Sequence, residues 1–443
     1  MAKANKLVAV LAAAALACGF LAGGMPTAHA APTLATYSFT SPGWATFGIA
    51  LPQGEATGAV QVGSLPTQTD VKNAWPDGSI RYAIVTTHVA TVGAYDITEG
   101  SAPTGTFTPV IPQARLTLTA ETAGLGSTVL PYVSDLPNTV SSDLWLSGPL
   151  VKEWRVRTAP KNAGVDHPFL TNIWDVRAYN DGTSTVDVTV ENVRDVAEAD
   201  GVVYGVNITV DGVSAYTHDA ARPGTGTLSG DNLNYTVDTA DLVLGNFIRL
   251  TSGPSAGQVV LVTGIDPAGG SIATYPTEFS PLAQTNATWE TVLYHQYGSR
   301  WHKLIPARGF LAADVVTDFA PFVAAGAVPD YLPTVSSAPE SPVETGQWQP
   351  FDLMGYGIIM PFTYAAGARP ELYLCPEWAA RFVAHGTPEL KTETLAYGDI
   401  SGNYCDDFAT SDPSKVVTVD DNPDYWLDPA LLISGGGSRV AGV

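Results

Sequence analysis

Cysteine, positive charge and long apolar runs are all scarce in this sequence, and each scarcity excludes a class of protein. Of 443 residues only three are Cys, and 21 Lys and Arg stand against 43 Asp and Glu, which gives a formal net charge of −22. Such a surface repels nucleic acid and anionic lipid, so we predict neither as a partner. Beyond the N-terminal segment no stretch of about 18 uncharged apolar residues occurs, so we predict no membrane span.

Several catalytic motifs are also missing. The chain has no H-E-x-x-H, no G-x-S-x-G, no P-loop and no G-x-G-x-x-G in a dinucleotide-binding context, which argues against zinc-protease, α/β-hydrolase and nucleotide chemistry. The Asp-rich segment "CDDFATSDPSKVVTVDDNPDYWLD" lacks the spacing of an EF-hand loop. We therefore predict no cofactor and no metal, with calcium at this segment as the alternative to a solvated acidic loop.

The N-terminus has the pattern of a secretory signal peptide. Lys3 and Lys6 precede an apolar run, and "AHA" ends at Ala30, so residues 1–30 combine a charged region, an apolar region and a small-residue cleavage site. A lipid anchor on Cys18 is the alternative, but Ala15 stands where a lipid-attachment box usually has Leu. We predict cleavage after Ala30 and a secreted protein, extracellular or periplasmic.

The remainder predicts a mainly β, multidomain protein. Gly (43) and Pro (33) are plentiful, as in chains with many short strands and turns. The chain is also too long for one ordinary core. We divide it into a β-barrel-like domain at 31–147, a central β-sandwich at 148–312 with a small β module inserted at 224–288, and a loop and helical region at 313–443.

Turn and cap residues set several element ends. Pro76-Asp77-Gly78, Asn180-Asp181-Gly182 and Asp211-Gly212 lie between alternating segments and predict hairpins. Pro376 predicts the start of a helix that ends at Gly386, and Thr387 followed by Pro388 predicts the N-cap of the next helix.

The richest candidate for chemistry is "YHQYGSRWHKLIP", residues 294–306. On a strand, Arg300 and His302 share a face. A fixed cation beside a titratable base is what β-elimination on a uronate requires. We assign Arg300 to the uronate carboxylate, His302 or His295 to the base, Trp301 to a stacking platform and Lys303 to substrate binding.

Two more substrate-binding candidates, Arg369 and Trp378, lie in "GARPELYLCPEWAARF". An enzyme should gather Arg369 and the 295–303 cluster in one concave pocket, whereas an adhesin should scatter them. The structural alternative is that the histidines and Arg300 satisfy buried carbonyls or pair with internal acids. Acids available for such pairing are Asp166, Asp175 and Glu191.

The stretch "TDVKNAWPDGSIRYAIVT" resembles the signature of the N-terminal RIFT-barrel domain of exo-rhamnogalacturonan lyase-like (YetA-like) proteins. "GPLVKEWRVR", "HPFLTNIWDVRAYNDGTSTVDVTVEN", "YHQYGSRWHKLI" and "AAGAVPDYLPTV" are similar, in that order, to stretches of related uncharacterised bacterial and prophage-encoded proteins. "AAGARPELYLCPEWAARFVAHG" resembles the start of the family's C-terminal helical domain. The resemblance spans most of residues 45–430, except the insertion.

The resemblance implies a RIFT-barrel-like N-terminal domain and a short C-terminal helical region like a truncated α/α toroid. It also implies a secreted carbohydrate-active protein, similar to polysaccharide lyases, that acts on or binds an acidic glycan. Its partner would be a polysaccharide or a cell-surface glycan. The alternative is a non-catalytic surface or phage-tail-like adhesin or structural protein, because the insertion resembles small β modules of phage tail proteins.

Cys375 and Cys405 are the two cysteines that follow the leader. In an exported chain we predict a disulfide between them, worth roughly 3–4 kcal/mol for its loop of about 30 residues. The mass of the unreduced protein, denatured before thiol alkylation, should show no alkylated cysteine. Two alkylated thiols would instead establish the alternative, a pair of free buried cysteines.

Overall fold

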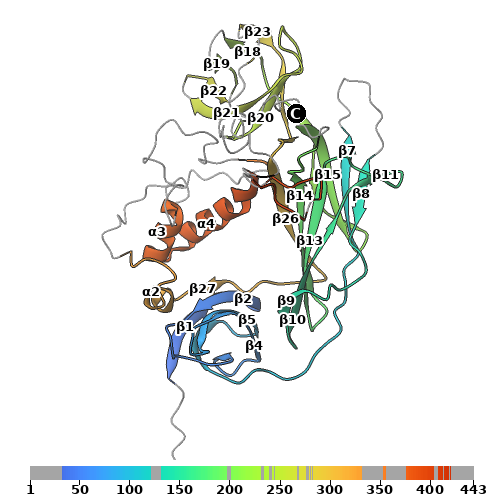
Figure 1. Cartoon of the computed structure of the whole chain (residues 1–443). Coiled ribbons are helices and arrows are strands. Elements are labelled where there is room, and N and C mark those ends of the chain that lie inside the picture. Colours follow the sequence, from blue (N-terminus) through green and yellow to red (C-terminus); the bar gives the residue numbers. More distant parts are fainter. Residues whose placement is uncertain are drawn as a thin grey trace, which may run out of the picture.

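The computed structural model describes residues 32–120, 131–196 and 201–331, the last with short gaps between 231 and 282, then 353–355, 376–403 and 408–420 with gaps at 413 and 419. Antiparallel strands dominate these residues and helices are few (Figure 1), which confirms the mainly β prediction. The predicted leader, the pair Cys375 and Cys405, Arg369 and most of the Asp-rich segment lie outside the described residues.

Two small sheets form the N-terminal domain. One has the order β27-β1-β6-β3 and the other β2-β5-β4. The alternating residues of these strands enclose one apolar core that includes Tyr37, Phe39, Ile49, Val85 and Ile97. The strands are β1 (Thr33–Phe39), β2 (Gly43–Ala50), β3 (Val60–Val62), β4 (Thr67–Ala74), β5 (Ile80–Val89), β6 (Gly93–Glu99) and β27 (Val315–Val316).

Residues far along the chain complete this domain. Strand β27 pairs with β1, and Ala313 and Phe322 pack into the same core. The short helix α2 (Ala320–Ala324) contacts β1 and β2. Residues near 313–324, which the sequence predicts to lie in the C-terminal region, therefore pack with the N-terminal domain, where β27 covers part of the edge of β1.

Two larger sheets make a β-sandwich-like centre. Their orders are β26-β14-β13-β10-β9 and β12-β11-β8-β7-β15-β16, and β25 pairs with β15. Trp154, Trp174 and Trp301 are buried in the shared core. The strands are β7 (Ala114–Ala120), β8 (Tyr132–Asp135), β9 (Leu144–Ser147), β10 (Val151–Thr158), β11 (Lys161–Asn162), β12 (Val165–Asp166), β13 (Thr171–Tyr179), β14 (Ser184–Asn192), β15 (Val202–Val210), β16 (Val213–His218), β25 (Tyr294–His295) and β26 (Ser299–Ala307).

The sheet pairings divide the chain earlier than the predicted boundary at 147. Strands β7 and β8 lie in the stretch that we had placed in the N-terminal domain, yet β7 pairs along its length with β15. Residues 100–113 form no strand and connect the two domains. Pairing with β15 buries Leu116 and Leu118 in the central core, and that burial determines which domain they join.

The insertion forms its own unit. Its sheet has the order β17-β24-β20-β21-β22-β19-β18-β23. It has a core cluster of its own, while Phe247, Leu261 and Val292 pack into the core of the sandwich. Figure 1 shows it beyond one end of the sandwich. The strands are β17 (Ala221–Pro223), β18 (Leu228–Gly230), β19 (Asn234–Thr236), β20 (Phe247–Leu250), β21 (Val259–Asp266), β22 (Ser271–Tyr275), β23 (Gln284–Ala287) and β24 (Trp289–Val292).

The helical region contains α3 (Glu377–His385), α4 (Pro388–Ile400) and the 3-10 turn η1 (Ser401–Asn403). The predicted caps are confirmed: Gly386 ends α3 with φ of 66°, and the Thr387 hydroxyl accepts a hydrogen bond from the Leu390 amide at 3.3 Å. Helix α4 contacts β26. The RIFT-barrel and toroid assignments stay predictions, since the described residues show only several antiparallel sheets and a few helices.

No helix among the described residues is long and apolar enough to span a bilayer.

The predicted hairpins are also present. Asn180-Asp181-Gly182 joins β13 to β14, with Gly182 at φ of 90°. Asp211 and Gly212 both have positive φ between β15 and β16, as a tight hairpin turn requires.

The turn at Pro76-Asp77-Gly78 closes β4 and β5. The Asp77 carboxylate accepts hydrogen bonds from the Ser79 amide at 3.0 Å and the Ser79 hydroxyl at 2.6 Å. Arg81 lies 4.7 Å from the Trp75 ring centroid. Trp75, Asp77 and Arg81 therefore serve the turn itself.

Asp77→Ala should lower the melting temperature, because both hydrogen bonds to Ser79 are lost. Those bonds lower the pKa of Asp77, so their contribution is present above the unfolded pKa of 3.8 and is lost as pH falls from there through the lower folded pKa. Thermal melts at neutral and acidic pH measure this, with Asp330→Ala as an exposed control. An equal change in both variants at neutral pH would contradict the assignment.

Candidate functional site

A polar contact fixes the N-terminal domain against the central sandwich. The Gln68 side chain, buried on β4, accepts hydrogen bonds from the amides of Leu150 and Val151 at 2.9 and 3.0 Å and donates to the Val151 carbonyl at 3.1 Å. A Cβ on Gly148 would lie 2.3 Å from the Gln68 side chain. The backbone at residue 148 can therefore lie this close to Gln68 only because glycine has no side chain.

Three aromatic rings extend this contact. Trp44 of β2 stacks on Tyr179 of β13 with centroids 4.5 Å apart, and Tyr179 stacks on Phe310 at 5.3 Å. The Trp44 indole N–H donates to the carboxylate of Asp181, in the β13–β14 turn, at 2.8 Å. The rings come from both domains and from the segment that returns to β27, so they hold three parts of the chain together.

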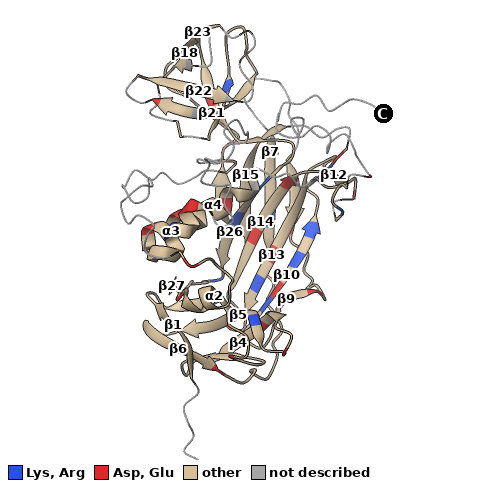
Figure 2. Cartoon of the chain, turned by 60° about the vertical axis from the view of Figure 1, so that its left-hand side comes forward, with Lys and Arg blue, Asp and Glu red and all other residues tan. Residues whose placement is uncertain are grey.

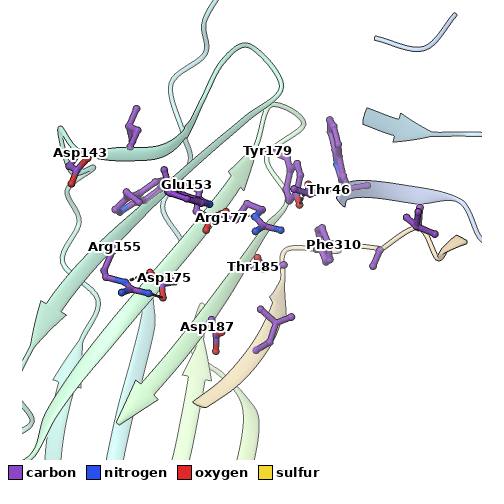
Figure 3. Close-up of a pocket in the computed structure, with 18 residues that line it drawn as sticks. Thr46, Asp143, Glu153, Arg155, Asp175, Arg177, Tyr179, Thr185, Asp187 and Phe310 are labelled. Carbon is purple, nitrogen blue, oxygen red and sulfur yellow. Dashed lines mark hydrogen bonds and ion pairs between the residues drawn. The ribbon is translucent and has the colours of Figure 1, made fainter. Parts of the chain in front are cut away.

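A cleft of about 770 Å³ opens beside this contact, a size typical of ligand sites. Figure 3 shows charged side chains of the sandwich on one side and Thr46 and Phe310 on another. The lining residues are Trp44, Thr46, Asp143, Leu144, Trp145, Glu153, Trp154, Arg155, Asp175, Arg177, Tyr179, Thr185, Asp187, Leu304, Phe310, Ala312, Ala313 and Val315.

The outer face of the five-stranded sheet forms the charged side of the cleft. Because strand side chains alternate, apolar residues enter the sandwich core and charged residues point outward. Figure 2 shows blue and red bands across β10, β13, β14 and β26. Arg155 binds Asp175 with two hydrogen bonds of 2.8 Å, and Arg177 Nε lies 2.5 Å from Glu153 Oε2. Bidentate and charge-assisted bonds of this kind fix side-chain positions.

Trp145 of β9 gives the cleft an exposed aromatic surface. Its side chain is 52% exposed, unusual for so large an apolar group. Lys72 lies 4.1 Å from the ring centroid and donates to the Trp145 carbonyl. This anchored indole beside paired arginines and carboxylates combines an apolar face with many hydrogen-bonding groups.

The structure places His295 and Trp301 in the core. The side chain of His295 is fully buried, and Trp301 is 1% exposed. Trp301 Nε1 donates to the Tyr204 hydroxyl at 2.7 Å, and that hydroxyl lies 2.5 Å from His295 Nδ1. His295 Nε2 lies 2.9 Å from the Ser299 carbonyl. Our assignments of His295 as a base and Trp301 as a platform are therefore wrong, and the structural alternative describes both residues.

Arg300 and His302 share the outer face of β26, as predicted. Arg300 lies 3.8 Å from Glu191, the nearly buried acid that also binds Arg157. His302 Nδ1 lies 3.0 Å from the Asp187 carboxylate, and Nε2 lies 3.8 Å from Asp399 on α4. Neither residue lines the cleft, because α4 contacts this end of β26.

The remaining candidates are separated. Lys303 faces the opposite side of β26, with its ammonium 4.8 Å from the Tyr216 ring centroid. Trp378 is buried and stacks on Tyr397 at 4.0 Å, joining α3 to α4. Arg369 lies outside the described residues. The described members of the predicted cluster are thus scattered between core, sheet face and helices.

Sequence reasoning missed Trp145, Arg155 and Arg177. A signal was present: the period-two charges in "KEWRVR" and "DVRAY" mark outward-facing positions on two strands. Combined with the hairpin at Asn180-Asp181-Gly182, that alternation indicates a charged sheet face. The cleft itself depends on the N-terminal domain, and no local pattern shows how that domain docks.

The pKa values of His295 on β25 and His302 on β26 should be shifted in opposite directions. Burial lowers the pKa of His295 from 6.5 to about 4, whereas the hydrogen bond that His302 donates to the Asp187 carboxylate raises the pKa of His302. At a pH midway between 4 and 6.5, NMR of the ring protons should show neutral His295 and protonated His302. The variant His302→Gln identifies which signal belongs to His302. The stability linked to His295 exists above pH 6.5 and falls toward pH 4, while that linked to His302 exists below 6.5 and is lost as pH rises through its folded pKa. A His295 signal that titrates near 6.5 would contradict its burial.

A scan against protein-family models found no match to this chain, and a search of curated proteins found none either. The resemblance to exo-rhamnogalacturonan lyase-like proteins contributes an expectation to be tested.

Proposed function

We propose that this protein binds a glycan in the cleft between its N-terminal domain and the five-stranded sheet, and that it does so outside the cell or in the periplasm. The observation that carries the proposal is the exposed, anchored Trp145 beside the Arg155–Asp175 and Arg177–Glu153 pairs in one cleft. An indole presents a flat apolar surface to the C–H face of a sugar ring. The paired groups keep further donors and acceptors for its hydroxyls.

The geometry favours binding over β-elimination. Among the described residues, the cleft lining contains no histidine and no lysine. His302 is held between Asp187 and Asp399, and its raised pKa makes it a weaker candidate for accepting a proton at neutral pH. The scattering of the predicted catalytic cluster supports the adhesin alternative over the lyase. The β module at 221–292, which has a sheet of its own, fits a protein built from several contact surfaces.

Trp145→Ala should weaken glycan binding about tenfold or more, equivalent to about 1.4 kcal/mol, because the stacking surface is removed. The melting temperature should change little, since the ring is exposed and the bond from Lys72 goes to the backbone. Affinity electrophoresis against a panel of plant and bacterial polysaccharides measures binding, and absorbance of unsaturated products tests for lyase activity.

Trp75→Ala is the matched control. Trp75 also lies beneath a cation, Arg81, but it is not among the cleft residues, so glycan binding should persist. Equal binding by wild type and Trp145→Ala would place the site elsewhere. Unsaturated products released by the wild type would favour the lyase.

A further inference from the structure

The charged residues around the cleft bear on which kind of glycan it could bind. Its described lining carries four carboxylates and two arginines. The carboxylates belong to Asp143, Glu153, Asp175 and Asp187. Lys72 over the Trp145 ring and His302 against Asp187 add cations next to the lining, so what a ligand meets depends on how the two lining arginines are paired.

Both arginines already have carboxylate partners. Arg155 uses Nε and Nη2 for Asp175, and Arg177 uses Nε for Glu153. The carboxylate side chains of Asp175 and Glu153 are largely buried, more so than the arginines that bind them. A carboxylate in such a position is costly to leave without its cation.

A sugar carboxylate would have to compete for these arginines. It would displace Asp175 or Glu153, or add a further negative charge beside them and Asp143, and like charges brought together oppose binding. A sugar hydroxyl has no such conflict. It can accept from guanidinium N–H groups that the pairs leave available and donate to the remaining carboxylate lone pairs.

We infer that the cleft selects neutral glycans and that the Arg155–Asp175 and Arg177–Glu153 pairs exclude carboxylated ones. This inference rests on the proposed function, and it replaces the acidic glycan expected from the family resemblance. The paired carboxylates act as internal competitors that occupy the arginines which a uronate would need.

The test compares each polysaccharide in its neutral form with the same polymer after selective oxidation of its primary hydroxyls to carboxylates. The wild type should bind the oxidised form at least about tenfold more weakly. Asp175→Asn keeps the side-chain shape, removes one negative charge and releases Arg155, so binding of the oxidised form should rise about tenfold. Glu153→Gln should act in the same direction through Arg177 and provides a second variant if the first folds poorly.

Asp135→Asn is the control for net charge. Asp135 pairs with Arg115 at 2.6 Å on β7 and β8, and neither residue lines the cleft, so the ratio of the two affinities should stay at its wild-type value. A wild type that binds the oxidised polymer as tightly as the neutral one overturns this inference and leaves glycan binding intact. Equal shifts in Asp175→Asn and Asp135→Asn also overturn it. Binding to neither form of any polymer overturns the proposed function itself.

Discussion

The packing of Trp44 on Tyr179, with Gln68 bonded to the start of β10, is the contact on which the cleft depends. It joins β2 and β4 of the N-terminal domain to β10 and β13 of the sandwich. The stack buries two large rings, and the amide of Gln68 satisfies backbone groups that would otherwise be buried without partners. A contact that is both apolar and directionally hydrogen-bonded sets the angle between the domains, and the cleft is the space which that angle leaves open.

The charged sheet face follows from the same arrangement. A strand in a sandwich has one face for the core, so its other face is polar by default. Here the N-terminal domain and α4 lie against parts of that face, and charges removed from water need partners. The five-stranded sheet supplies them across adjacent strands, where Arg155 meets Asp175 and Arg177 meets Glu153 in register. Pairing that stabilises the partly covered sheet also determines what a ligand can find there.

The elements with local causes could be predicted from the sequence. The turns at Asn180-Asp181-Gly182 and Asp211-Gly212, and the cap at Thr387, each depend on a few neighbouring residues and were placed correctly. The domain to which β7 and β8 belong could not be predicted. Their alternating pattern fits a sheet of the N-terminal domain or of the sandwich, and only the pairing of β7 with β15 decides between them. The position of Trp145 in the cleft likewise depends on distant parts of the chain, since Lys72 of the N-terminal domain lies over its ring.

The candidate site was misplaced for a related reason. His295, Trp301 and Arg300 are close in the chain, and their chemistry looks catalytic when only composition is considered. Alternation on β26 sends Trp301 into the core and Arg300 to the outer face. The reverse turn before β26 brings the His295 ring to the Ser299 carbonyl. Residues adjacent in sequence on a strand are separated by the thickness of the sheet. The residues that share a surface instead come from neighbouring strands, as Arg155 and Asp175 do. In a protein made mostly of sheets, a binding surface is therefore encoded across strands, and its constituents become visible only when the register is known.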